Sequence, residues 1–137
     1  MPVTGALVLA ADTVVVLDDD VLGKPATHDE ARRMLRCLSG RTHTVYTGIA
    51  LAHDGRIVTD HRATRVTFAD LSDDEIERYV ATGEPLHVAG AFTIDGLGSP
   101  FVEVVAGDAG TVIGLCLPLL RRMTLELGVG WFDLVDP

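Results

Sequence analysis

Residues 42–68, THTVYTGIALAHDGRIVTDHRATRVTF, decide the fold because they predict two long antiparallel strands. Apolar residues alternate through the first half around Val45, Ile49 and Leu51, which is the two-residue period of a half-buried strand. Asp54-Gly55 is a preferred two-residue turn, and it leads directly into a second strand over residues 56–68. The stretch therefore predicts a long β-hairpin.

The segments on either side of this hairpin add further strands, three helices and a turn. Residues 6–17, ALVLAADTVVVL, are apolar and rich in β-branched residues, which predicts a buried strand, and Val21-Leu22 predicts a short returning strand. Thr27 and Glu30 have the spacing of a helix capping box, as do Ser72 and Glu75. Further along we expect a strand at 101–105, a turn at 107–110, a helix at 118–127 and a short closing strand at 131–135. The changing apolar period predicts a single α/β domain over residues 1–137.

Composition and charge restrict the class of protein. The chain has 137 residues with 20 acidic and 11 basic side chains, giving a net charge of −9. A protein with this balance is a poor binder of nucleic acid polymers, which require clustered Lys and Arg. No apolar run approaches the roughly 20 residues that span a bilayer, and no charged segment precedes the first apolar run, so we expect neither a membrane partner nor a secretory signal. The two cysteines form no CxxC pair, which favours a cytoplasmic location.

Four local features point towards a site that handles phosphate groups. Asp12 interrupts an apolar strand, and a carboxylate there is either buried with partners or directed into a site. Lys24 lies between glycine and proline, a constrained position that can present one cation. Arg41 and His43 lie together beyond a helix end, and Asp95 is the single acid within the small-residue stretch 89–98. Each feature alone is ordinary, and their combination favours phosphate binding.

Several blocks in a fixed order give the chain a specific resemblance. Together they are similar to the Maf family of nucleoside triphosphate pyrophosphatases, also described as septum-formation inhibitors. The blocks that carry the resemblance are Ala11–Val15, Gly23–Pro25, Ser39–Gly48, Thr82–Pro85, Ala89–Gly96 and Val112–Leu115.

This resemblance implies an inosine-triphosphatase-like α/β fold, with an elongated mixed sheet, flanking helices and a cleft between two lobes. It also implies a metal-dependent enzyme that cuts a nucleoside triphosphate between the α and β phosphorus atoms. The family begins with a strand, a Ser/Arg-rich loop and a helix, and no part of the given sequence matches them. We therefore expect exposed apolar side chains and unpaired backbone groups along the strand at 6–17, self-association with a homodimer as one form, and low activity.

The resemblance also assigns roles to individual residues. It places Asp12 at the position of the proton acceptor and Thr13 at a position that tunes base choice. Lys24 and Arg41 fall in cleft segments, so with His43 they are candidate substrate-binding residues. Asp95 stands where the family has a glutamine that contributes to base selection.

A bound metal is expected because a triphosphate brings several negative charges to an acidic protein. Mg²⁺ or Mn²⁺ would take carboxylate oxygens together with phosphate oxygens, and Asp12 and Glu84 are the candidate donors. The expected substrates are dTTP and UTP. Two alternatives stay open: a 7-methyl-GTP pyrophosphatase, because an acid at position 95 can accept hydrogen bonds from guanine, and a catalytically impaired nucleotide-binding protein that regulates cell division.

Overall fold

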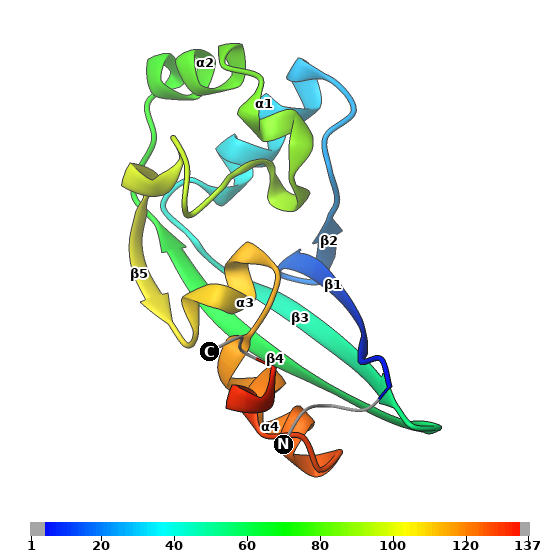
Figure 1. Ribbon diagram of the computed structural model, residues 1–137. Coiled ribbons are helices and arrows are strands. Elements are labelled where there is room, and N and C mark those ends of the chain that lie inside the picture. Colours follow the sequence, from blue (N-terminus) through cyan, green and yellow to red (C-terminus); the bar gives the residue numbers. More distant parts are fainter. Residues whose placement is uncertain (1–4, 135–137) are drawn as a thin grey trace.

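The computed structural model describes residues 5–134 and contains one five-stranded sheet with the strand order β2-β1-β3-β4-β5 (Figure 1). The expected central hairpin is present, since β3 and β4 pair along their whole length from Thr42↔Thr67 to His53↔Arg56. The strands are β1 (Val8–Leu17), β2 (Asp20–Leu22), β3 (Thr42–His53), β4 (Arg56–Phe68) and β5 (Val102–Ala106).

Every strand pair in the described residues is antiparallel, whereas the resemblance implied a mixed sheet. The chain turns back at the β1–β2 and β3–β4 hairpins. Between them it re-enters the sheet beside the end of β1, where Thr44 pairs with Val16. A strand that begins where its neighbour ends must run antiparallel to it.

Within residues 5–134, four α-helices and four short 3₁₀ segments accompany the sheet. Both predicted capping boxes cap helices: the Thr27 hydroxyl accepts from the Glu30 N–H at 3.1 Å, and the Ser72 hydroxyl accepts from the Glu75 N–H at 3.1 Å. The helices are α1 (His28–Leu38), α2 (Asp73–Ala81), α3 (Ala109–Ile113) and α4 (Leu117–Glu126), and the 3₁₀ segments are η1 (Glu84–His87), η2 (Ala89–Ala91), η3 (Ser99–Phe101) and η4 (Trp131–Asp133).

Three expectations from the sequence were wrong. The strand expected to be buried at 6–17 is exposed over its first half, with Val8 62% and Leu9 44% exposed, as expected from the resemblance. The turn expected at 107–110 runs into α3, because the Asp108 carboxylate accepts from the Thr111 N–H at 3.0 Å and caps a new helix. The strand expected at 131–135 is the 3₁₀ turn η4, which closes through a 3.0 Å hydrogen bond from the Gly130 N–H to Asp133. Val135 itself lies outside the described residues.

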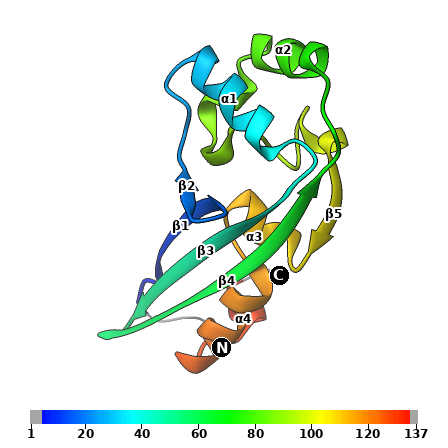
Figure 2. The same cartoon turned by 180° about the vertical axis from the view of Figure 1, so that it is seen from behind.

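The helices cover one face of the sheet in two separate groups. One apolar cluster joins the sheet to α1 and α2, and a second joins the middle of β3 to α4. Figures 1 and 2 show the resulting two lobes, with α1 and α2 at one end of the molecule and α4 at the other. The opposite face of the sheet is open, with Tyr46 41% and Ile57 72% exposed. Within residues 5–134, no helix combines the length and apolar character needed to cross a bilayer.

Candidate functional site

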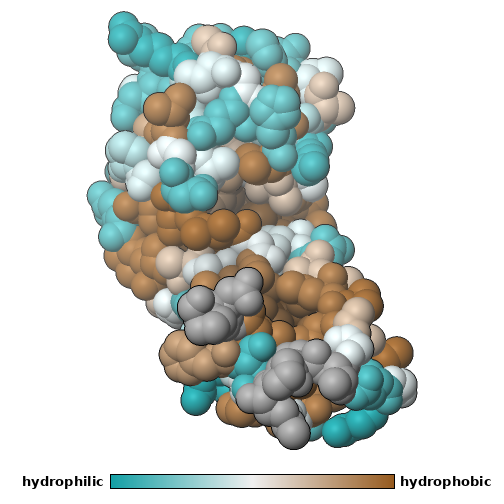
Figure 3. Space-filling view, in the orientation of Figure 1, coloured by the Kyte–Doolittle hydropathy of each residue, from teal (hydrophilic) through white to brown (hydrophobic). Residues whose placement is uncertain are grey.

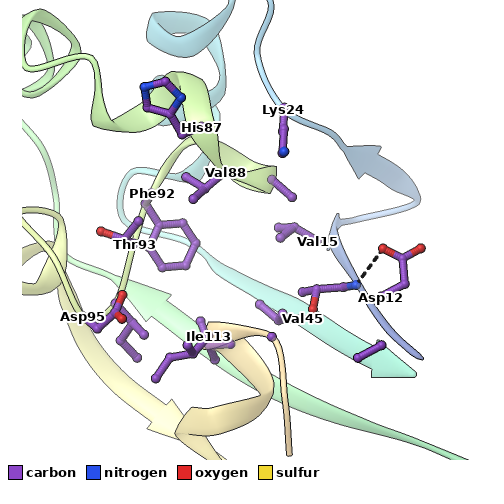
Figure 4. Close-up of a pocket in the computed structure, with 16 residues that line it drawn as sticks. Asp12, Val15, Lys24, Val45, His87, Val88, Phe92, Thr93, Asp95 and Ile113 are labelled. Atoms are coloured by element: carbon purple, nitrogen blue, oxygen red, sulfur yellow. Dashed lines mark hydrogen bonds between the residues drawn. The ribbon is translucent and has the colours of Figure 1, made fainter. Parts of the chain in front are cut away.

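A cleft of about 420 Å³ lies on the helix-covered face of the sheet, where the two lobes meet. Figure 3 shows apolar residues gathered at this level, below the hydrophilic surface of α1 and α2. One wall is β1, another is the segment that includes η2, and the end of α3 closes the cleft between them (Figure 4). The lining residues are Ala11, Asp12, Thr13, Val15, Lys24, Val45, His87, Val88, Ala89, Phe92, Thr93, Ile94, Asp95, Val112, Ile113 and Gly114.

Asp12 lies in the middle of β1 at the rim of the cleft, its side chain is exposed, and it also lines a shallow hollow beside Gly48 and Thr59. Asp12 pairs with Gly48 across the sheet, so no neighbouring side chain on β3 covers its carboxylate. Oδ1 accepts a hydrogen bond from the Thr13 N–H at 2.9 Å, which fixes the carboxylate against its own strand. The second oxygen remains open to a ligand, a metal ion or a water molecule.

Thr13 carries a hydroxyl whose hydrogen-bonding role is determined by its neighbours. The Thr47 hydroxyl donates to the Thr111 carbonyl at 2.6 Å, so its single proton is committed to α3. Thr13 Oγ1 and Thr47 Oγ1 are 2.9 Å apart, and Thr13 must therefore be the donor of that pair. With its proton used in this way, Thr13 can offer a ligand only an acceptor.

Lys24 and Asp95 lie on different sides of the cleft. Lys24 projects from the loop after β2, and a hydrogen bond from the Gly90 N–H to the Gly23 carbonyl at 3.2 Å ties that loop to η2. Asp95 is exposed on the loop after η2 and lies across the cleft from Asp12 and Lys24 in Figure 4. Among the described lining residues, Lys24 is the single lysine or arginine, against two carboxylates.

Two expected substrate-binding residues do not line the cleft. The Arg41 guanidinium forms an ion pair with Asp18 instead. His43 is 2% exposed and lies in the core, with its ring 5.3 Å from those of Phe68 and Phe92, measured between centroids. Burial lowers the pKa of His43 to about 4, so the ring is neutral near pH 7 and offers a phosphate no positive charge.

The second expected metal ligand, Glu84, also lies outside the cleft lining. Its Oε1 accepts from the Leu97 N–H at 3.1 Å, and its Oε2 is shielded from solvent. Within residues 5–134, no three His, Cys, Asp or Glu side chains are grouped so that they could hold a metal ion. Asp12, with one open oxygen, therefore fits a cation that is shared with substrate phosphates, and Glu84 does not.

Sequence reasoning missed the part of the cleft built by α3 and His87. Val112, Ile113 and Gly114 end α3 and form one wall, although this region was expected to begin as a turn. Asp108 was the available signal, because an aspartate three residues before Thr111 is a common helix N-cap. His87 has no comparable signal, since only the packing of η1 brings its exposed side chain to the cleft.

Comparison with known proteins identifies the family. Residues 3–127 match the family described as Maf-like protein, and the chain belongs to that family. It is 49% identical to a nucleoside triphosphate pyrophosphatase of Streptomyces coelicolor, over 98% of this chain and 66% of the relative. A protein of the same name from a Synechococcus strain is 54% identical over 93% of this chain and 66% of its own length. A dTTP/UTP pyrophosphatase of Bacillus cereus is 47% identical over 85% of this chain and 61% of its own length. The chain thus spans slightly less than two thirds of these curated relatives.

Proposed function

We propose that this protein is a nucleoside triphosphate pyrophosphatase that hydrolyses dTTP or UTP to the monophosphate and pyrophosphate. The observation that carries the proposal is the cleft, which brings together Asp12, Thr13, Lys24 and Asp95 from three separate segments of the chain. The names of its relatives, all nucleotide pyrophosphatases, support the same reaction class.

Asp12 is the proposed proton acceptor for the water that attacks the α-phosphorus. It is one of the two carboxylates that line the cleft, it belongs to β1, which pairs with β3 along nine positions, and one of its oxygens is open. The Thr13 N–H holds the other oxygen, so the carboxylate keeps a fixed direction without a competing salt bridge. General base catalysis of this kind contributes roughly 10²–10⁴-fold to a rate.

The charges in the cleft explain why a divalent cation is expected to bind together with the triphosphate. Lys24 can neutralise one of the several negative charges of a triphosphate, while Asp12 and Asp95 add two more to the cleft. Mg²⁺ commonly binds through one or two carboxylates and substrate phosphates, and Asp12 would be its protein ligand here. When bound, the ion would neutralise charge on the departing pyrophosphate.

Base selection is assigned to Thr13 and Asp95. Thr13 presents an acceptor, as does the Asp95 carboxylate, and either one suits the single ring N–H of uracil or thymine. Asp95 equally suits the donor edge of guanine, so 7-methyl-GTP is the second candidate substrate.

The test is pyrophosphate release from dTTP, UTP and 7-methyl-GTP with Mg²⁺, using wild type and Asp12→Asn. We expect turnover of at least one pyrimidine nucleotide by wild type and its loss in the variant. Calorimetric titration with the same nucleotides is the companion measurement. Binding without pyrophosphate release by wild type would contradict the enzymatic proposal and favour a nucleotide-binding role.

A further inference from the structure

A buried polar cluster lies behind the loop that carries Asp95. It joins Tyr79 of α2, Glu84 of η1 and Thr93, which follows η2. The Thr93 N–H donates to the Tyr79 hydroxyl oxygen at 3.1 Å, and the Leu97 N–H donates to Glu84 Oε1 at 3.1 Å. These two bonds hold the loop on each side of Asp95.

Two glycines let the loop approach this cluster closely. A Cβ atom on Gly98 would lie 2.6 Å from the Tyr79 hydroxyl oxygen, and one on Gly96 would overlap Glu84 Oε1. Neither position has room for a side chain, so the backbone itself rests against Tyr79 and Glu84. The backbone at Gly96 therefore lies directly against the Glu84 carboxylate, and the backbone at Gly98 against the Tyr79 hydroxyl.

The cluster favours a charged Glu84. Burial opposes ionisation, but the Tyr79 and Thr93 hydroxyls and two backbone N–H groups that face the carboxylate outweigh it, and the pKa of Glu84 lies below its usual value. The same surroundings, above all burial, raise the pKa of Tyr79, which stays protonated. A charged carboxylate makes stronger hydrogen bonds to backbone N–H groups than a neutral acceptor would.

We propose that Glu84 is a positioning residue that fixes the loop 93–98 and thereby sets which nucleotide base the cleft accepts. This inference rests on the proposed function and replaces a metal-binding role for Glu84. Thr93, Ile94 and Asp95 line the cleft directly, while Glu84 holds the residues that follow them. Loosening the loop changes the position of Asp95 and leaves Asp12, on the sheet, in place.

Hydrogen exchange of the Leu97 amide in Glu84→Gln tests the clamp without any nucleotide. A neutral amide keeps the shape of the side chain but weakens its hydrogen bond, so we expect exchange at Leu97 to accelerate roughly tenfold or more. Glu103→Gln, on an exposed strand position, is the matched control and should leave this amide unchanged. Unchanged exchange at Leu97 in Glu84→Gln would overturn the proposal, whether or not the protein hydrolyses nucleotides.

Kinetics of the same variants separate the positioning role from metal binding. In Glu84→Gln we expect the ratio of kcat/KM values for dTTP, UTP and 7-methyl-GTP to change roughly fivefold or more, mainly through KM. The Mg²⁺ concentration for half-maximal activity should stay within about twofold of wild type. Tyr79→Phe removes the acceptor for Thr93 but keeps the ring against Phe101, so it should shift the same ratios. A large rise in the Mg²⁺ requirement of Glu84→Gln alone would overturn the proposal in favour of a metal ligand.

Discussion

The buried His43 predicts a specific loss of stability in mild acid. Its ring is packed edge-on against Phe68 and Phe92, and neither ring nitrogen has a hydrogen-bond partner. Protonation would place an unpaired charge in this core, which is the reason that burial lowers its pKa from 6.5 to about 4. The neutral ring carries only the smaller cost of two unpaired polar atoms.

The size of the effect follows from the two pKa values. Between pH 6.5 and about 4 the unfolded chain binds a proton at this residue that the folded chain does not, so the free energy of unfolding falls as the pH falls. One pKa unit corresponds to about 1.4 kcal/mol, which gives about 2 kcal/mol lost by pH 5 and about 3 kcal/mol in full. The contribution is fully present above pH 6.5. Against a typical stability of about 5–15 kcal/mol, this loss is readily measured.

Urea unfolding of wild type and His43→Leu at pH 7.5 and pH 5 is the assay. The leucine has its own packing cost, but that cost does not depend on pH. We expect the stability difference between the two proteins to move by about 2 kcal/mol in favour of the variant on going to pH 5. His61→Gln, at an exposed position, is the control and should keep the wild-type pH dependence. If the free energies of unfolding of wild type and His43→Leu differ by the same amount at pH 7.5 and pH 5, the proposed role of His43 is refuted.

Four further outcomes are expected. In Asp12→Asn the amide oxygen still accepts from the Thr13 N–H, so the melting temperature should hold, while pyrophosphate release should fall roughly 10²-fold or more because the proton acceptor is lost. Near-normal turnover would remove Asp12 from the mechanism. Asp95→Gln should change the ranking of dTTP, UTP and 7-methyl-GTP by roughly tenfold in kcat/KM, and an unchanged ranking would leave Asp95 no part in base selection. Thr47→Val should cost about 1–3 kcal/mol in urea unfolding, because it leaves the buried Thr111 carbonyl unpaired, and a neutral result would contradict the hydroxyl chain. Val8→Lys places a charge on a β1 residue that is 62% exposed and beyond the reach of β2, so sedimentation should show less self-association; equal association in both proteins would place the contact elsewhere.

Local sequence signals predicted most of the fold. The Asp54-Gly55 turn and the flanking alternation were sufficient for the central hairpin, because turn type and strand period are encoded within a few residues. The capping boxes at Thr27 and Ser72 located the starts of α1 and α2 in the same way. The five-residue helix α3 escaped prediction, since it is too short to show an apolar period and depends on the Asp108 cap.

Long-range packing limited the prediction of the site. Asp12, Thr13, Lys24 and Asp95 were all expected at the site, and all line one cleft. Arg41 and His43 are close to one another in sequence, but β3 directs His43 into the core, while Arg41 precedes the strand and pairs with Asp18. The sequence shows that Glu84 is acidic but not which groups surround it. A metal-binding role was therefore predicted for a residue that holds the Leu97 N–H instead.

The parts of the cleft are held in place by different kinds of structure. Asp12 and Thr13 belong to a strand that pairs with β3 along nine consecutive positions, so their placement depends on the sheet as a whole. Lys24 depends on a loop tied by one backbone hydrogen bond, and Asp95 on a loop held by Tyr79 and Glu84. Opening a loop requires less free energy than opening a strand paired within a sheet. Substitutions in the loop supports should therefore change nucleotide selectivity first, and bond cleavage should be lost only when Asp12 or its strand is disturbed.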